Sequence, residues 1–260
     1  SSITVPFFWS LSNDKNFTIT TRIFDTENPL LLGEYHQAYA NAELIADFGY
    51  TKGYKRTSAK KQAGDKSHFF SKFTKNFSWK KNSQNELDIV FQDVSDDKYL
   101  KLYKLDSILV DHGTNTLENS IKFSHEENDM FIGLNASAFE TLKENYNDKY
   151  EYILPEITLD KNLFSSNKFG SLDLQSNFKA HNYDTNKSSN FLVNNFNWNF
   201  KDKKFSNGIK GRFLTNLKNI NYESKNIENL KQDTTSELYG AFGYFSEIDL
   251  QKEENGNRYS

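Results

Sequence analysis

The chain has 260 residues, a net charge of −3 at pH 7, a pI of about 6.0 and no cysteine. This charge argues against general affinity for nucleic acid. The lack of cysteine excludes disulfides within the chain, thiol catalysis and cysteine-metal sites. Only 36% of the residues are hydrophobic and the mean hydropathy is −0.77, yet 15% are aromatic, whereas disordered chains are poor in aromatic residues. Large rings diluted by polar residues indicate many strands with one apolar and one polar face.

Apolar and polar residues alternate along the whole chain, and this period of two predicts β-strands. About thirteen such segments of roughly 9 to 14 residues are expected, separated by turn-forming clusters. In chain order, clear examples are 69–80, 87–92, 117–123, 130–134, 172–179, 195–201 and 238–250. The clearest turns are 12–16, 80–85, 125–129 and 183–190. One short helix is predicted, over residues 138–145.

These segments are long for a globular protein, whose strands average about 5 to 6 residues. Alternating segments of about ten residues are typical of antiparallel transmembrane β-barrels of the outer membrane. On this interpretation Phe196, Trp198 and Phe200 face lipid, and Asn197 and Asn199 face a wet interior. A soluble β-sandwich or solenoid with one packed face stays open as an alternative. The start at a serine and the polar last ten residues suggest a fragment.

Residues suited to chemistry are scattered. The carboxylates of residues 93–99 lack the length and the terminal Glu of an EF-hand loop, so we predict a polar turn there. The sequence has no G-x-S-x-G motif, and no pair of carboxylates stands out as acid and base. We therefore predict no catalytic residue, no metal site, no cofactor and no enzyme activity. Five histidines are expected to be polar residues of the surface or the lumen: His36, His68, His112, His125 and His181.

Four stretches resemble one family when they are taken in order. Residues 3–24, "ITVPFFWSLSNDKNFTITTRIF", resemble its first two barrel strands, with an aromatic-Trp segment after a proline and then Thr-x-Thr-x-Arg. Residues 30–39, "LLLGEYHQAY", are similar to its next strand. Residues 94–103, "VSDDKYLKLY", resemble its Ser-Asp-x-x-Tyr turn, and residues 152–160, "YILPEITLD", a later strand. The family is the lipopolysaccharide-assembly protein LptD of Gram-negative outer membranes.

The resemblance implies a very large barrel of about 26 strands, which inserts lipopolysaccharide into the outer leaflet. Residues 1–260 would be a single-domain fragment, the first part of that barrel, without the closing strands. An absent N-terminal periplasmic jelly-roll domain would receive the lipid from an LptA-like bridge, and an LptE-like lipoprotein would plug the barrel. The other partner would be outer-membrane lipid.

The family's lipid is thought to leave through a lateral opening between the first and last strands. By resemblance, the first-strand residues at this lateral gate are Pro6, Phe7, Phe8 and Trp9. Family members often carry a second proline where this chain has Thr21. The alternatives are a porin or receptor-type barrel, and a soluble β-rich binding or adhesin module.

Overall fold

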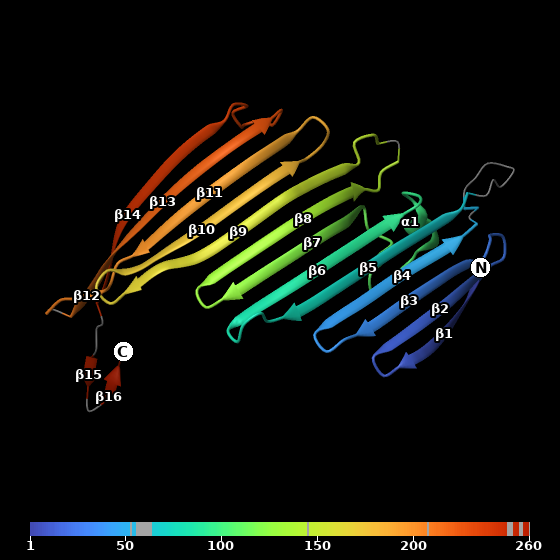
Figure 1. Cartoon of the computed structure of the whole chain (residues 1–260), viewed down its shortest axis with the longest axis horizontal. Helices are drawn as coiled ribbons and strands as arrows, with labels where there is room; N and C mark the ends of the chain where they lie inside the picture. Colours follow the sequence, from blue (N-terminus) through green and yellow to red (C-terminus); the bar gives the residue numbers. More distant parts are fainter. Residues whose placement is uncertain are drawn as a thin grey trace.

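The computed structural model describes residues 1–52, 54–55, 64–144, 146–206, 208–248, 252–254 and 257–259. Within this part of the chain, a single antiparallel sheet holds 14 strands. Each strand from β1 to β11 pairs with the next along the chain, and β13 follows β11. β14 pairs with β13 alone, so the sheet is open, with β1 at one edge and β14 at the other (Figure 1).

Thirteen of these strands are long, between 9 and 17 residues, which confirms the predicted number of long strands. β9 and β13 exceed the expected length, with 17 residues each. The long strands are β1 (Ser2–Ser12), β2 (Lys15–Phe24), β3 (Leu30–Ala38), β4 (Ala42–Thr51), β5 (Lys66–Phe77), β6 (Ser83–Val94), β7 (Thr116–Glu127), β8 (Met130–Thr141), β9 (Tyr150–Ser166), β10 (Gly170–Asn182), β11 (Ser188–Asn199), β13 (Ile209–Lys225) and β14 (Thr235–Ile248). The short elements are β12 (Lys203–Lys204), the hairpin of β15 (Lys252–Glu254) and β16 (Asn257–Tyr259), and the helix α1 (Tyr99–Tyr103).

The predicted helix at residues 138–145 is wrong. Residues 138–141 continue β8 and pair with β7 and β9, and residue 145 lies outside the described residues. Ladder bonds to two neighbouring strands outweigh the helix propensity of so short a segment, which would be marginal even with good helix formers. The observed helix lies instead in the connection after β6, where a polar turn was expected.

The connections at the two ends of the strands differ in length. At one end most turns are short and comprise residues 13–14, 39–41, 78–82, 128–129 and 167–169, and only the connection 200–208, which contains β12, is longer. At the other end, where Ser1 also lies, the connections are residues 25–29, 52–65, 95–115, 142–149, 183–187 and 226–234. We call these the short-turn end and the long-connection end.

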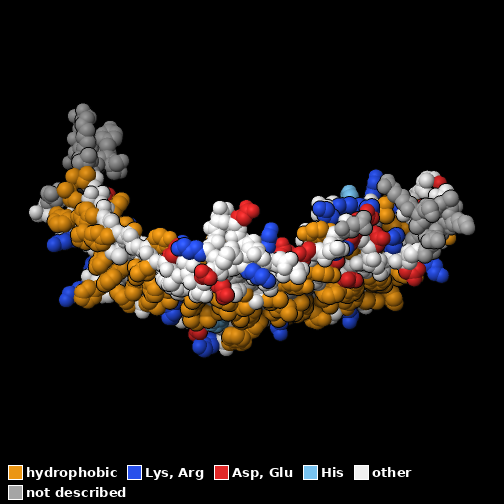
Figure 2. All heavy atoms as spheres, turned by 90° about the horizontal axis from the view of Figure 1, so that it is seen from above, with side chains coloured by type: hydrophobic (Ala, Val, Ile, Leu, Met, Phe, Trp, Pro, Cys, Tyr) orange, Lys and Arg blue, Asp and Glu red, His pale blue; other side chains and the backbone are white. Residues whose placement is uncertain are grey.

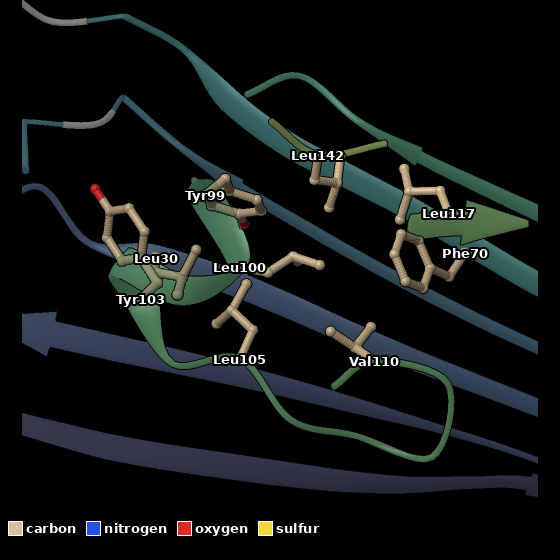
Figure 3. Packing of buried hydrophobic residues seen from close by; sticks show 9 residues of the cluster. All are labelled: Leu30, Phe70, Tyr99, Leu100, Tyr103, Leu105, Val110, Leu117 and Leu142. Carbon is tan, nitrogen blue, oxygen red and sulfur yellow. The ribbon is translucent and has the colours of Figure 1, made fainter. Parts of the chain in front are cut away.

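The longest connection, residues 95–115, folds back over one face of the sheet, and we call it the cap segment. It contains α1 and contributes Tyr99, Leu100, Tyr103, Leu105 and Val110 to the buried apolar cluster (Figure 3). The sheet and a neighbouring connection supply the remaining members: Leu30, Phe70, Leu117 and Leu142. This cluster is small for a chain of this length, because most large apolar side chains lie outside it and many of them are exposed. In the described chain, no helix is long and apolar enough to cross a membrane.

Candidate functional site: the two faces and the first edge of the sheet

One face of the sheet is apolar from the first strand to the last. Residues directly opposite each other in an antiparallel ladder share a face, so the register assigns side chains to faces. This face is the convex side of the curved sheet, where hydrophobic side chains form a continuous layer (Figure 2). It carries one large apolar residue from each long strand: Phe7, Ile19, Leu31, Phe48, Phe69, Ile89, Ile121, Leu134, Ile157, Leu174, Phe196, Leu217 and Phe242.

Many of these side chains are far more exposed than core residues. The exposed fraction is 62% for Phe7, 55% for Ile121 and 70% for Phe242. Monomeric soluble proteins rarely expose apolar patches larger than a few hundred Å². A layer that crosses thirteen strands therefore calls for an apolar partner along the whole sheet.

Along the concave face, on which the cap segment lies, runs a row of polar side chains. Its residues, one from each strand from β2 to β11 and from β13, are Arg22, Glu34, Asp47, Lys72, Asp88, Lys122, Asn135, Glu156, Gln175, Asn195 and Asn216. From β2 to β9 most of these side chains are charged, whereas on β10, β11 and β13 they are amides. The sheet thus has one apolar face and one face with a row of polar side chains.

Aromatic residues line the convex face at both ends of the strands. All three tryptophans lie toward the short-turn end: Trp9 three residues before the end of β1, Trp79 within the turn after β5, and Trp198 near the end of β11. Trp79 folds back against Phe123, with ring centroids 5.6 Å apart. Tyrosines mark the long-connection end, among them Tyr50, Tyr150 and Tyr152.

The structure places two of the three predicted lipid-facing rings on the convex face within β11. Phe196 lies opposite Leu174, and Trp198 opposite Leu172. Phe200 follows the end of β11 and stacks on Trp198, with ring centroids 4.4 Å apart. Trp198 also donates a 2.9 Å hydrogen bond from Nε1 to the backbone oxygen of Phe169 in the turn before β10. Contact of these rings with lipid stays a prediction.

The predicted gate residues lie in β1, which pairs only with β2. Phe7 and Trp9 point to the convex face, and Pro6 and Phe8 to the concave face. Hydrogen-bonded and non-hydrogen-bonded pairs alternate along an antiparallel ladder. The amide of Asp25 donates to the oxygen of Ser1, so the odd-numbered residues of β1 form the hydrogen-bonded pairs. The nitrogen of Pro6 therefore faces the free edge.

The cap segment is held to the concave face by directed contacts as well as by packing. Arg22 donates to the backbone oxygen of Tyr103 at 2.6 Å, and Lys55 to that of Leu102 at 2.7 Å. Asp96 of the segment pairs with Lys66 at 2.6 Å. Burial alone would favour the neutral carboxyl, but hydrogen bonding from the Lys66 ammonium holds the pKa of Asp96 below its ordinary value.

Two buried polar side chains lie beneath the cap segment, where Asp47 and His68 meet at 2.5 Å. Gly49 leaves room for them, because a Cβ at this position would lie 2.5 Å from the His68 ring and 2.7 Å from the Tyr99 hydroxyl. That hydroxyl is buried and makes no hydrogen bond with the described residues, and burial raises the pKa of Tyr99 above its ordinary value. The tight packing makes the segment a fixed part of this face.

The histidines are better partnered than their spacing in the sequence suggested. His68 pairs with Asp47, His181 with Glu151 and His112 with Asp106, over separations of 21, 30 and 6 residues. The first two pairs join different strands, and no spacing rule within one strand or turn would find them.

One group of side chains in the described chain has ligand atoms close enough to hold a metal ion. It comprises Asp106, Asp111 and His112 in the cap segment, with these atoms within 4.8 Å of one another. All three residues are exposed, and the hydrogen bonds between His112 and Asp106 lower the pKa of the Asp106 carboxyl. Nothing else at this group points to a ligand. In residues 93–99, where the sequence argued against an EF-hand loop, Asp96 and Asp97 pair with lysines.

Comparison with known proteins adds no relative: no protein-family model matches the sequence, and no curated protein matches it. The physical separation of the two faces therefore carries the functional argument.

Proposed function

We propose that the chain forms part of the wall of an outer-membrane β-barrel, with its convex face against lipid and its concave face lining an aqueous lumen. The observation that carries this proposal is the exposed apolar layer to which every long strand from β1 to β14 contributes. Transmembrane barrel strands alternate between lipid-facing apolar and lumen-facing polar residues. A soluble binding or adhesin module would have to cover this whole layer with another surface.

The height of the apolar layer supports a membrane. On β10, Leu172 lies opposite Trp198 at one end, and Asn182 lies opposite Tyr152 at the other. At about 3.4 Å per residue the stretch between them is about 34 Å long. A strand tilt of about 40° reduces this length to about 26 Å along the membrane normal, close to the apolar band of about 25 Å between aromatic girdles in such barrels.

The two free edges support a larger barrel. β1 and β14 each have a row of backbone groups with no partner strand in the described chain. In lipid such groups must be satisfied by further strands, so other strands would close the barrel between these edges. A wide lumen would also leave room for the cap segment on the concave face.

Within this class we propose lipopolysaccharide assembly, with lipid released through a lateral gate at β1. The support is the ordered resemblance to the LptD family together with the position of Pro6. Its missing N–H faces the edge that the closing strand would pair with, and proline weakens a ladder there. The chain would then work with an LptE-like plug and receive lipid from an LptA-like bridge. A porin needs no weak seam of this kind.

The experiment has two parts, both on the complete protein. Spin labels on cysteines that replace Ile121 and Phe242 should relax faster in the presence of oxygen dissolved in lipid. Labels that replace Lys122 and Asn216 should relax faster in the presence of a water-soluble nickel complex. The reverse pattern, or equal effects of each reagent on labels of both faces, would reject the barrel wall. Depletion of the protein in a Gram-negative host should leave newly made lipopolysaccharide on the periplasmic side. Normal surface delivery under depletion would reject lipopolysaccharide assembly while leaving the barrel intact.

A further inference from the structure

The concave surface of β10, β11 and β13 carries a group of neighbouring side-chain amides, which are linked across strands. Asn216 donates from Nδ2 to Oδ1 of Asn197 at 2.7 Å, and it also bonds to Oδ1 of Asn195. Asn195 in turn approaches Gln175 at 3.4 Å, and Asn177 on the same face donates to the Thr158 hydroxyl at 3.1 Å. We call Gln175, Asn177, Asn195, Asn197 and Asn216 the amide surface.

These contacts use only some of the donors and acceptors of the amides, and they hold the amide groups in fixed positions. Each amide offers two N–H donors and one oxygen acceptor. Asn216 donates both of its bonds from Nδ2. Its Oδ1 accepts no bond from the described residues. The Nδ2 group of Asn197 likewise makes none with them. Donors and acceptors therefore alternate over a surface whose side chains already hold one another in place.

The amide surface has little net charge and is not covered. Charged side chains of both signs flank it on the same face, Asp160 and Asp173 against Lys179 and Lys218, and Asp173 accepts a 2.6 Å bond from Asn162. The cap segment packs instead over the other part of the concave face, against Leu30 and Phe70. At the short-turn end the surface continues through Asn199 into an open hollow of about 450 Å³, lined by polar residues that include Ser165, Asn167, Ser171, Asn199, Asp202 and Arg212.

We infer that the amide surface binds a neutral, hydroxyl-rich carbohydrate chain. A sugar hydroxyl both donates and accepts, so it matches amides that present both functions side by side. A phosphorylated chain would need concentrated positive charge, which this surface lacks. The inference rests on the proposed function in one respect, namely that the concave face lines the lumen through which the sugar part of a lipid passes.

Titration calorimetry on the complete protein in a detergent without sugar groups tests the inference, with maltoheptaose as the neutral probe and dextran sulfate as the charged one. The test variant carries Asn195→Ala, Asn197→Ala and Asn216→Ala. Its matched control carries Ser176→Ala, Asn194→Ala and Asn219→Ala, which lie on the convex face of β10, β11 and β13. A heat-dependent shift on gels, equal for both variants and the unmodified protein, excludes unfolding as the cause of any loss.

The Kd for maltoheptaose should rise at least tenfold in the test variant and stay unchanged in the control. Dextran sulfate should bind more weakly than maltoheptaose to the unmodified protein. No heat of maltoheptaose binding to the unmodified protein, or an equal loss in both variants, would overturn the inference. The outcome is separate from that of the proposed function: sugar binding without lipopolysaccharide export rejects only the translocon, and export without sugar binding rejects only the amide surface.

Discussion

Pro6 lies opposite Thr20 in a pair whose backbone groups point away from each other. Proline at this position removes no bond between β1 and β2, but it leaves one donor missing from the row that β1 presents to its free edge. The interruption is therefore specific to whichever strand pairs with that edge.

Pro6→Ala in the complete protein should tighten that pairing. One restored hydrogen bond is worth roughly 0.5–1.5 kcal/mol net, which at the upper value is about a tenfold shift of an opening equilibrium. The expected result is slower delivery of lipopolysaccharide, measured as leakiness to a bulky antibiotic and as lipid accumulating upstream. Pro29→Ala, in the connection between β2 and β3, is the control and should change little. Normal export by Pro6→Ala, together with a block of export by a disulfide between β1 and the closing strand, would mean that Pro6 is not the weak point of the seam.

Neighbouring residues of β11 provide a test of the face assignment. Leu192 is 37% exposed and shares the convex face with Phe178, whereas Val193 points to the concave face. Leu192→Arg near the middle of the membrane should lower the free energy of unfolding by about 2–4 kcal/mol. Val193→Arg and Asn197→Arg should have mild effects, because both side chains meet water. Trp198→Arg should cost less than Leu192→Arg because Trp198 lies near the strand end. Urea unfolding of the complete protein in vesicles measures all four, and equal costs at Leu192 and Val193 would contradict the orientation.

The 260-residue chain alone should not form a heat-stable barrel in detergent. Its edges at β1 and β14 leave backbone groups that detergent tails cannot satisfy. On gels it should run at the same position with and without boiling and be digested by protease. A protease-resistant monomer that shifts on heating would show that these two edges can close on each other.

The cap segment should loosen at alkaline pH. Burial raises the pKa of Tyr99, so the packed segment holds the phenol proton more tightly than the released one does. Its packing is then independent of pH below the ordinary tyrosine pKa of about 10 and weakens as pH rises above it. Protease cleavage within residues 95–115 of the complete protein, followed from pH 8 upward, measures the release.

Tyr99→Phe provides the matched variant. It removes the ionisable group together with a buried hydroxyl that makes no hydrogen bond with the described residues, so packing at neutral pH should be at least as stable. The alkaline release should move to higher pH in Tyr99→Phe and stay unchanged in the exposed control Tyr39→Phe. The same release profile in all three proteins would exclude Tyr99 as the titrating group.

The strands could be predicted from the sequence because alternation is a local signal. Leu172, Asp173 and Leu174 show in three residues which faces they will occupy, and pairing with β9 and β11 only fixes the register. The cap segment could not be predicted in this way. Tyr99, Leu100 and Tyr103 are buried because strands far along the chain supply Leu30 and Phe70, and no local pattern carries that information.

The same limit applies to the candidate sites. The amides of β11 could be recognised as polar from the sequence. Their hydrogen bonds to Asn216 depend on the register between β11 and β13, which the sequence does not show. The direction of the Pro6 nitrogen likewise depends on which pairs of the β1–β2 ladder are hydrogen-bonded. Sequence alternation assigns a side chain to a face, whereas cross-strand chemistry requires the paired sheet.

The placement of all three tryptophans at the short-turn end has a spectroscopic consequence. Since Trp9, Trp79 and Trp198 lie at one rim of the convex face, the intrinsic fluorescence of the protein reports on a single interface of the membrane. Quenchers attached at different depths along the lipid chains would then locate that rim alone, without any introduced label. Movement of the opposite, long-connection end would stay invisible to these three side chains and would need a label introduced there.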